Sequence, residues 1–266
     1  MWKIELENDE DREFIIDGIK NGFKLVDTPL ENIGKTLSDN HKSALINHDK
    51  VEARTQEEMT DGNYVRANKD ELKIISPLAA IEKADRDIRL IHDLGYPNGK
   101  GQNYYATKDD CVYESVEDIL PNLTLECYLA KCNLKWAYRS IRVDKAHQTL
   151  TGLQWTFKGD SHTTILKDTA LGMGARKSPA IFNRITQAIK LMMFRRGFRC
   201  HAYLDDFLLY EHTFEKCAKA LACLIKLLHS LGFKIAWPKV ADPCKRLVFL
   251  GIDIDVTNNK LSLDPA

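Results

Sequence analysis

The sequence predicts an α+β fold, in which a four-stranded antiparallel sheet carries two helices on one face. Two amphipathic segments with helix-capping residues predict the helices, and short apolar runs between them predict the strands. From residue 125 onward the order is strand, helix, strand, strand, helix, strand, with one hairpin inserted after the first strand. This split βαββαβ order places the first strand beside the central hairpin. We therefore expect the strand end near Asn133 to approach the hairpin tip that holds Asp205 and Asp206.

The composition is typical of a globular protein with reduced thiols. The 266 residues, 44% of them hydrophobic, are enough for one large domain or two small ones. The 38 basic and 38 acidic residues cancel, so nucleic-acid binding is not excluded but gains no general electrostatic attraction. The seven cysteines include no CxxC pair, which argues against a zinc site or a disulfide framework.

The N-terminal stretch "MWKIELENDEDREF" is acidic and has no apolar run, so it does not read as a signal peptide. No stretch of the chain approaches the roughly 20 apolar residues that a membrane span needs. We therefore expect an intracellular protein, cytoplasmic or nuclear, with no membrane partner.

The first half of the chain predicts one helix and two hairpins around a buried strand. Residues 1–70 are polar, and only one amphipathic helix is predicted there, from about Ser43. Apolar runs on either side of a charged turn at residues 83–87 predict a hairpin. The stretch "LTLECYLAKCNL" predicts a buried strand that ends near Asn133. The stretch "LTGLQWTFKGDSHTTILK" predicts a second hairpin, which turns at residues 158–161.

Two helices are predicted in the second half of the chain. In "SPAIFNRITQAIKLMMFRRG", Ser178 is predicted as the N-cap, Pro179 as the first helical residue and Gly197 as the end. A second helix is predicted between Thr213 and Gly232, because apolar residues recur there at helical spacing. The stretch "RLVFLGIDIDV" predicts a last strand region.

The stretch "HAYLDDFLLY" places two adjacent carboxylates between strongly apolar flanks. A pair of aspartates alone is typical of a turn, because the side chain bonds nearby backbone N–H groups. Here the tip stands on a core element, where two carboxylates repel each other unless a cation neutralises them. Mg²⁺ prefers carboxylate oxygens and substrate phosphates, and two such ions clamp the attacking and leaving oxygens of a phosphoryl transfer. The pattern therefore favours a metal site over a simple turn.

These segments resemble the motifs of reverse transcriptases. "YLDD" resembles the central motif, "NLKWAYRSIRV" the first palm motif and "LGMGARKSPAIFN" the second. "LGFKIAWPK", "LVFLGIDID" and "SPLAAIEKADRDIRLIHDLGYP" resemble the lysine-bearing segment, the primer-grip hairpin and the finger hairpin. The six motifs follow the family's order over about residues 74–256. "RLIHDLGYP" and "FLGIDID" look most like retrotransposon enzymes of the DIRS (tyrosine-recombinase) type.

The resemblance implies a reverse-transcriptase palm and fingers without a thumb. Residues 1–70 would be a polar region within or before the fingers, residues 71–124 the fingers, and residues 125–266 the palm with a primer-grip-like hairpin. The implied partners are an RNA or DNA template-primer and dNTPs. The implied cofactor is Mg²⁺ or Mn²⁺.

The resemblance also assigns nucleotide-binding roles. Tyr138 would be the steric gate under the sugar of the incoming nucleotide. Lys83 and Arg89 would hold the triphosphate, and Lys239 would lie near the leaving pyrophosphate. Gly174 would let the backbone approach the base pair. Without the motifs, these residues read as a strand-end aromatic, solvated basic residues and a loop glycine.

Asp205 and Asp206 would be the catalytic metal ligands, and the important departure from the family lies at Asn133. The family has an aspartate there, whereas asparagine offers one neutral carbonyl oxygen and no charge. Losing one stabilising group of this kind commonly costs a factor of about 10²–10³ in rate. No nearby acid clearly replaces it, since Asp144 lies well along the chain.

Basic residues gather around the first palm motif, where they would either contact phosphates or form a solvated face. They are Lys131, Lys135, Arg139, Arg142 and Lys145.

Two functions remain open. One is a reverse-transcriptase-like enzyme for RNA-directed DNA synthesis, whose activity Asn133 calls into question. The other is a catalytically inactive nucleic-acid- or protein-binding module derived from a retrotransposon.

Overall fold

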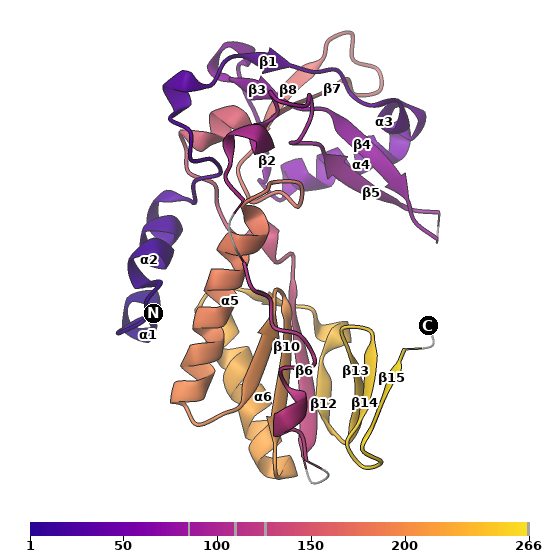
Figure 1. The fold of residues 1–266 in the computed structure, drawn as a ribbon. Helices are drawn as coiled ribbons and strands as arrows, with labels where there is room; N and C mark the ends of the chain where they lie inside the picture. The colour runs from indigo at the N-terminus through magenta and orange to yellow at the C-terminus, as the bar shows by residue number, and fades with distance from the viewer. Residues whose placement is uncertain (85, 109–110, 125–126, 265–266) are drawn as a thin grey trace. The chain divides into compact units, whose positions relative to one another are not determined.

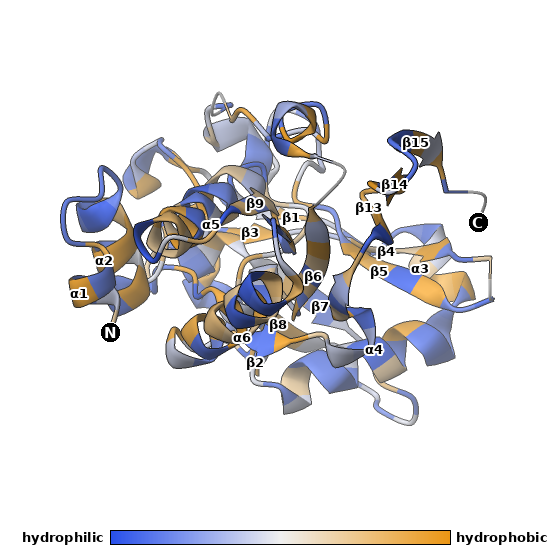
Figure 2. Ribbon diagram, turned by 90° about the horizontal axis from the view of Figure 1, so that it is seen from below, coloured by the Kyte–Doolittle hydropathy of each residue, from blue (hydrophilic) through white to orange (hydrophobic). Residues whose placement is uncertain are grey.

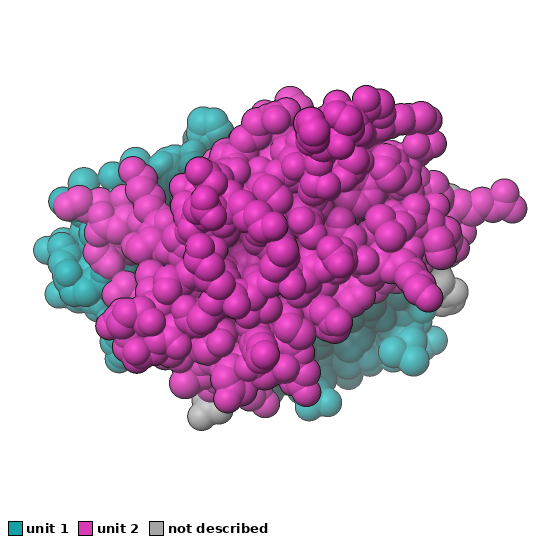
Figure 3. Space-filling view, turned by 90° about the horizontal axis from the view of Figure 1, so that it is seen from above, with its two compact units in different colours: residues 1–16, 111–137, 182–266 teal, residues 17–110, 138–181 magenta. Residues whose placement is uncertain are grey.

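The chain folds into two compact units, each made of segments that are separate in sequence (Figure 3). The computed structural model describes residues 1–84, 86–108, 111–124 and 127–264. Unit 1 comprises Met1–Ile16, Cys111–Ala137 and Phe182–Ala266. Unit 2 comprises Asp17–Asp110 and Tyr138–Ile181. Both units combine helices with sheets, which confirms the α+β class.

Unit 1 is built on a five-stranded antiparallel sheet. Its strands are β6 (Tyr128–Lys135), β9 (Cys200–Tyr203), β10 (Asp206–Glu211), β11 (Lys234–Ile235) and β12 (Ala241–Cys244). The central strand is β6, which pairs with β10 along one edge and with β11 and β12 along the other. The predicted neighbourhood of the first strand and the central hairpin is therefore confirmed. The predicted fourth strand, "RLVFLGIDIDV", was wrongly assigned to this sheet, because it lies in a separate one. Its place is taken by β11 and β12, two short segments without the apolar run that would have predicted them.

Two long helices follow the predicted positions, and Figure 2 shows both with hydrophobic and hydrophilic residues alternating along the ribbon. They are α5 (Ser178–Arg195) and α6 (Phe214–Ser230). Helix α6 packs on β6, β10 and β12 (Figure 1). The predicted start of α6 after Thr213 is confirmed, and Thr213 caps the helix by accepting a hydrogen bond from the Lys216 N–H.

Helix α5 begins differently from the prediction. Ser178 is its first helical residue rather than its N-cap. The Ser178 hydroxyl is buried and has no hydrogen-bond partner among the described residues, so it does not cap the helix. The predicted end of the helix is confirmed, because Gly197 follows it with a φ of 79°.

A second sheet completes unit 1 near the C-terminal end of the described chain. Its strands are β13 (Arg246–Phe249), β14 (Ile252–Asp255) and β15 (Lys260–Leu263). Leu250 and Gly251 both have positive φ, which is the backbone of a tight two-residue hairpin turn. The resemblance anticipated this hairpin, but the sequence did not predict β15. One apolar cluster packs residues of this sheet against β6 and β10, and it comprises Val116, Ile119, Leu129, Leu208, Leu247, Phe249, Ile254 and Val256.

The first residues of the chain are helical, which the sequence did not predict. The short helix α1 (Trp2–Glu5) is followed by α2 (Arg12–Asn21). The indole N–H of Trp2 donates to the carbonyl of Leu231 at 3.2 Å. The prediction failed here because tertiary contacts of this kind leave little trace in the hydrophobic periodicity of the segment.

Unit 2 contains a mixed five-stranded sheet and a separate hairpin. The sheet runs in the order β1 (Thr36–Leu37), β3 (Ile74–Ile75), β7 (Gly152–Trp155), β8 (Thr164–Asp168) and β2 (Tyr64–Arg66). The hairpin consists of β4 (Leu78–Glu82) and β5 (Ile88–His92). Both predicted hairpins, β4–β5 and β7–β8, are therefore confirmed.

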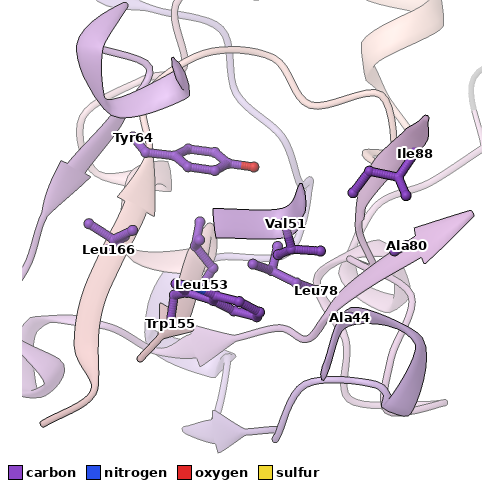
Figure 4. Packing of buried hydrophobic residues seen from close by; sticks show 9 residues of the cluster. All are labelled: Ala44, Val51, Tyr64, Leu78, Ala80, Ile88, Leu153, Trp155 and Leu166. Atoms are coloured by element: carbon purple, nitrogen blue, oxygen red, sulfur yellow. The ribbon is translucent and has the colours of Figure 1, made fainter. Parts of the chain in front are cut away.

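Helices α3 (Lys42–Ile46) and α4 (His48–Thr60) cover the region where one helix was predicted from Ser43. Their apolar residues join a core centred on the fully buried indole of Trp155 (Figure 4). The other members of this core are Ala44, Val51, Tyr64, Leu78, Ala80, Ile88, Leu153 and Leu166. A buried aromatic ring of this size contributes much of the apolar area that stabilises such a small unit.

Short 3₁₀ helices connect these elements. They are Leu30–Asn32, Lys69–Glu71, Gln102–Tyr105, Leu120–Asn122, η5 (Tyr138–Ser140), His147–Leu150 and η7 (Trp237–Lys239). In the part of the chain that the structure describes, none of the helices combines the length and apolarity needed to cross a bilayer.

Three sequence expectations touch residues outside the described ranges. The predicted fingers–palm boundary falls at Leu125, the turn of the first hairpin includes Asp85, and the predicted palm ends at Ala266. The division into residues 1–70, 71–124 and 125–266 stays a prediction.

Candidate metal and nucleotide site

Strands β6 and β10 bring Asn133 and the acidic tip together. Asp206 lies directly opposite Asn133 in the antiparallel ladder. The next backbone bond runs from the Leu134 N–H to the carbonyl of Asp205, at 2.9 Å. The expected approach of Asn133 to the two aspartates is therefore confirmed.

The tip itself is a tight turn between β9 and β10. Tyr203 ends β9, Asp206 begins β10, and the two residues pair across the turn. Leu204 has a φ of 50°, a conformation that branched L-residues rarely adopt. Strain of this kind costs on the order of 1–3 kcal/mol and is found most often at functional sites. The aspartate pair is thus both a turn and a cluster of charge, so the two interpretations of the sequence do not exclude each other.

The protonation of Asp206 depends on its surroundings at the tip. Burial and the adjacent charge of Asp205 raise the pKa of Asp206 to about 6. The ammonium groups of Lys239 and Lys131 act in the opposite direction and keep the pKa from rising further. A cation placed at the tip would favour the ionised pair for the same reason that these lysines do.

The side-chain oxygen of Asn133 is buried without a hydrogen-bond donor among the described residues. Asn133 is 5% exposed, and its Oδ1 makes no hydrogen bond with any described residue. Its backbone carbonyl accepts from the Ala236 N–H at 2.9 Å, which fixes the strand at this point. A buried acceptor without a partner costs about 1–3 kcal/mol and calls for an explanation such as a bound ion. Within the described ranges, no three His, Cys, Asp or Glu side chains gather as a metal-binding group.

Two lysines flank this site. Lys239 ends η7 and is exposed. Lys131 precedes Asn133 by two residues on β6, so both side chains point to the same face of the sheet. The Lys131 ammonium donates to the carbonyl of Val248 on β13 at 2.9 Å. Sequence reasoning grouped Lys131 with the basic residues of the motif, although its even spacing from Asn133 on a strand was the signal for its place beside Asp206.

Glu114, which contacts two residues of β9, is a residue that the sequence did not point to. Its Oε2 lies 3.0 Å from His201 Nδ1 and accepts a hydrogen bond from the Ala202 N–H at 3.3 Å. Its Oε1 pairs with Lys190. Although burial opposes ionisation, the hydrogen bonds from His201 and Lys190 lower the pKa of Glu114 to about 2. This carboxylate therefore fixes the strand that leads into the acidic tip.

The four remaining predicted residues lie in unit 2. Lys83 and Arg89 belong to the β4–β5 hairpin, where the Lys83 ammonium lies 3.1 Å from the Asp87 carboxylate. Arg89 is exposed and pairs with Ile81 across the hairpin. A side chain that is exposed on a hairpin can reach a ligand, but the hairpin alone does not identify one.

Tyr138 and Gly174 occupy two loops of unit 2. Tyr138 begins η5 and is half-buried. Gly174 approaches another segment so closely that an added Cβ would lie 2.5 Å from the carbonyl oxygen of His92. Its own carbonyl accepts from the Asn103 side chain at 2.8 Å. Packing within unit 2 is therefore enough to explain why residue 174 is a glycine.

A buried ion cluster holds the segment after Tyr138. The guanidinium of Arg139 lies 2.7 Å from both the Asp168 and the Glu58 carboxylates. It also donates to the carbonyl of Leu171 at 3.3 Å, in the loop that leads to Gly174. Arg139 is thus neither a free phosphate contact nor part of a solvated face, the two alternatives that the sequence left open.

Asp144 does not substitute for the missing carboxylate at position 133. Its Oδ1 accepts hydrogen bonds from the N–H groups of Ala146 and His147, and its own N–H donates to the carbonyl of Phe23. The carboxylate therefore caps a turn of unit 2. Unit 1 thus gathers Asn133, Asp205, Asp206 and Lys239, whereas Lys83, Arg89, Tyr138 and Gly174 belong to unit 2.

Comparison with known proteins gives one family. The family model described as reverse transcriptase (RNA-dependent DNA polymerase) matches residues 81–254. The Gag-Pol polyprotein of Gibbon ape leukemia virus is 28% identical over 181 residues, which are 66% of this chain and 10% of that protein. The Gag-Pol polyprotein of Koala retrovirus is 24% identical over 180 residues, with the same shares of each chain. The chain spans about a tenth of the length of these polyproteins.

Solved structures share the fold over nearly the whole chain. A foamy viral protease-reverse transcriptase in complex with double-stranded DNA has a TM-score of 0.68 at 18% identity, and the match covers 98% of this chain and 46% of that one. The foamy viral protease-reverse transcriptase in complex with an RNA/DNA hybrid gives the same TM-score and identity, over 98% and 36%. At this identity the likeness establishes the fold, with its fingers and palm.

Proposed function

Because this chain belongs to the reverse transcriptase (RNA-dependent DNA polymerase) family, we propose that its reaction is RNA-directed DNA synthesis by two-metal nucleotidyl transfer. In this reaction the 3′-hydroxyl of a primer attacks the α-phosphate of a dNTP, and pyrophosphate leaves. The observation that carries the proposal is the acidic tip of Asp205 and Asp206 held directly against Asn133.

The donor atoms at the tip fit a hard divalent cation. Asp205 and Asp206 offer carboxylate oxygens, and Asn133 offers a buried carbonyl oxygen to which no described residue donates a hydrogen bond. Mg²⁺ and Mn²⁺ prefer such oxygens. When bound, the ions would neutralise the charge that develops on the transferring phosphoryl group. Burial and the adjacent Asp205 raise the pKa of Asp206, and a bound cation would act in the opposite direction, which supports this proposal.

The nucleotide-binding roles belong to this proposal. Lys239 would act near the leaving pyrophosphate, since its ammonium already interacts with Asp206. Lys83 and Arg89 would hold the triphosphate from the exposed hairpin of unit 2. Tyr138 would crowd a ribose 2′-hydroxyl, and Gly174 would let its loop approach the base pair.

The template-primer and dNTP partners also belong to this proposal, as does a retrotransposon origin of the DIRS type. Structures with the same fold are described as complexes with double-stranded DNA and with an RNA/DNA hybrid, which supports the choice of nucleic acid. The phrases "RLIHDLGYP" and "FLGIDID" support the retrotransposon origin.

A second candidate function is a nucleic-acid-binding module without catalysis. It is favoured by the missing charge at Asn133, because one of three carboxylates is replaced by a neutral amide. It is also favoured by Lys131 and Lys239, which already offset part of the charge of Asp206 without any metal. Removal of one stabilising group commonly lowers the rate by a factor of about 10²–10³, so slow synthesis and no synthesis are the two outcomes to separate.

Primer extension on an RNA template separates the two candidates. The full chain is compared with Asn133→Asp, Asp205→Asn and the control Asp242→Asn, which makes the same chemical change at an exposed position of β12. Each variant is assayed with Mg²⁺ and with Mn²⁺, after its folding is checked by thermal unfolding.

Three results are distinguishable. Extension by the chain that is lost in Asp205→Asn and kept in Asp242→Asn establishes an enzyme that tolerates Asn133. Extension by Asn133→Asp alone establishes a silenced polymerase with its other site groups intact. If neither the chain nor Asn133→Asp extends a primer, the polymerase proposal fails for this chain and the binding module stands.

A further inference from the structure

We propose that Lys135, Trp136 and Lys234 form a binding site for single-stranded nucleic acid on unit 1. We call these three residues the tryptophan platform. The choice of nucleic acid rests on the proposed function. The platform itself rests on geometry in unit 1, and its residues include none of the metal-binding or nucleotide-binding residues proposed above.

The platform is built where β6 ends. Lys135 is the last residue of β6, and Lys234 lies directly opposite it as the first residue of β11. Trp136 follows at once with a φ of 57°. The ammonium nitrogens of Lys135 and Lys234 lie 4.1 Å and 4.8 Å from the centre of the indole ring. Two positive charges are therefore gathered on one aromatic side chain.

The two ammonium groups of the platform contact the indole ring but form no ion pair with a described carboxylate. Both lysines are exposed, and within the described ranges neither ammonium lies within 4.0 Å of a carboxylate oxygen. Trp136 leaves 46% of its surface exposed. By contrast, Arg184 lies over Phe14 and also bonds the Asp11 carboxylate, as expected of a structural contact. Lys135 and Lys234 have no such carboxylate partner among the described residues, so their charges are available to an anion.

The segment that follows the platform also carries an exposed tryptophan and an exposed lysine. After Lys234 the chain runs through Trp237 to Lys239, and Trp237 is 64% exposed. A second exposed indole and a further ammonium thus follow the platform on the same short segment. Exposed aromatic rings that alternate with basic residues are the usual composition of surfaces that bind single strands.

Single-stranded nucleic acid is the ligand that satisfies both parts of the platform. An unpaired base has a free face that can stack on the indole, and the adjoining phosphates can take the two ammonium groups. The cation–π contacts seen here are worth only about 0.5–1 kcal/mol at an exposed site, so the lysines can turn toward phosphates without a large loss. In a duplex the base faces are covered by stacking, and an acidic peptide offers carboxylates but no flat ring.

The test is oligonucleotide binding by the full chain in EDTA, without dNTPs. Fluorescence anisotropy of a labelled single strand of about 12 nucleotides gives the Kd over a series of salt concentrations. The variants are the double change Lys135→Gln with Lys234→Gln, and the single changes Trp136→Phe and Trp136→Asn. The double change Lys219→Gln with Lys226→Gln is the matched control, since both of these lysines are exposed on α6 in the same unit. Thermal unfolding confirms that each variant is folded.

The platform predicts specific changes. Each phosphate contact contributes about 0.7 to the slope of log Kd against log salt for a single strand, so loss of both lysines lowers the slope by about 1.4. Loss of a stacked base weakens binding roughly tenfold or more, so Trp136→Asn weakens it and Trp136→Phe retains most of it. The control variant keeps the slope and the affinity of the parent chain, and so does Asp205→Asn, because EDTA removes any contribution of metal.

Several results would overturn the platform. They are an unchanged slope in the Lys135 and Lys234 double variant, an equal loss in the α6 control, and equally tight binding of a duplex. Competition by poly-glutamate as effective as that of unlabelled single strand would assign the surface to an acidic protein instead. If the platform variants bind oligonucleotides like the parent chain, the proposal of a platform fails but the primer-extension test of the proposed function is unaffected. If the parent chain binds oligonucleotides normally but does not extend a primer, the binding module is supported.

Discussion

Asn133 lies directly opposite Asp206 in the ladder between β6 and β10, and the residues that follow Asp206 on β10 and flank Asn133 on β6 are buried. Like charges that face each other across strands destabilise a sheet, and the neighbouring Asp205 already raises the pKa of Asp206. An amide at position 133 relieves this repulsion in the absence of a cation. The substitution that weakens a metal site therefore favours the metal-free fold.

The first prediction is that Asn133→Asp lowers stability without metal and makes it depend on metal. In EDTA the third carboxylate adds repulsion of about 0.2–1 kcal/mol, so the variant unfolds at a lower temperature than the parent chain. Mg²⁺ at about 100 times its Kd should then add about 2.7 kcal/mol. Scanning calorimetry with and without Mg²⁺ measures both effects. Equal responses to Mg²⁺ in the variant and in the exposed-site control Asp242→Asn would contradict this prediction.

The second prediction concerns the pH dependence contributed by Asp206. Its pKa is raised from 3.8 to about 6 in the folded chain, chiefly by burial and then by Asp205. A carboxyl group whose pKa is higher in the folded state favours folding below the unfolded pKa, and this contribution is lost as pH rises through about 6. After a discount for partial solvent exposure, the loss is about 1–2 kcal/mol. Urea unfolding between pH 4 and pH 8 in EDTA should show this fall in the parent chain and a smaller one in Asp206→Asn.

The sequence predicted the elements that carry their own local signal. The helix after Thr213 has a capping side chain and helical spacing, and the strand that ends near Asn133 is a continuous apolar run, so both were found. The approach of Asn133 to the acidic tip followed from topology, because the split βαββαβ order places the first strand beside the central hairpin. The structure adds that Asp206 is the residue directly opposite Asn133.

What the sequence did not reveal depends on contacts between distant segments. Glu114 bonds His201 across 87 residues, and nothing in the acidic loop around Glu114 distinguishes it from a solvated turn. The sequence left Arg139 as either a phosphate contact or part of a solvated face, yet its partners Asp168 and Glu58 come from other elements. Long-range ion pairs leave no periodic pattern, so only the folded structure reveals them.

The third prediction concerns Gly174. An added Cβ at this position would lie 2.5 Å from the carbonyl oxygen of His92, and a backbone atom cannot rotate away as a side chain does. Gly174→Ala should therefore destabilise the chain by about 1–3 kcal/mol through overpacking. Gly34→Ala is the matched control, because a Cβ at Gly34 meets nothing within 4 Å. The midpoint of urea unfolding measures both variants, and equal midpoints would show that the loop of Gly174 moves freely.

The last prediction concerns the ion cluster of Arg139, which holds the segment after Tyr138. The Arg139 side chain is 14% exposed and that of Asp168 only 3%, so this pair is largely shielded from water. Arg139→Met leaves the Asp168 carboxylate buried without its main counter-charge, although burial itself already raises the pKa of this group. Breaking one side of a buried pair costs about 3–5 kcal/mol.

The double variant tests this explanation. Adding Asp168→Asn to Arg139→Met removes the uncompensated charge, so it should recover a large part of the lost stability. A merely steric role for Arg139 predicts no recovery, because the second change restores no volume. Urea unfolding of the parent, both single variants and the double variant completes the cycle. A loss below about 1 kcal/mol in Arg139→Met would mean that solvent reaches Asp168 and that the cluster does not hold the Tyr138 segment in place.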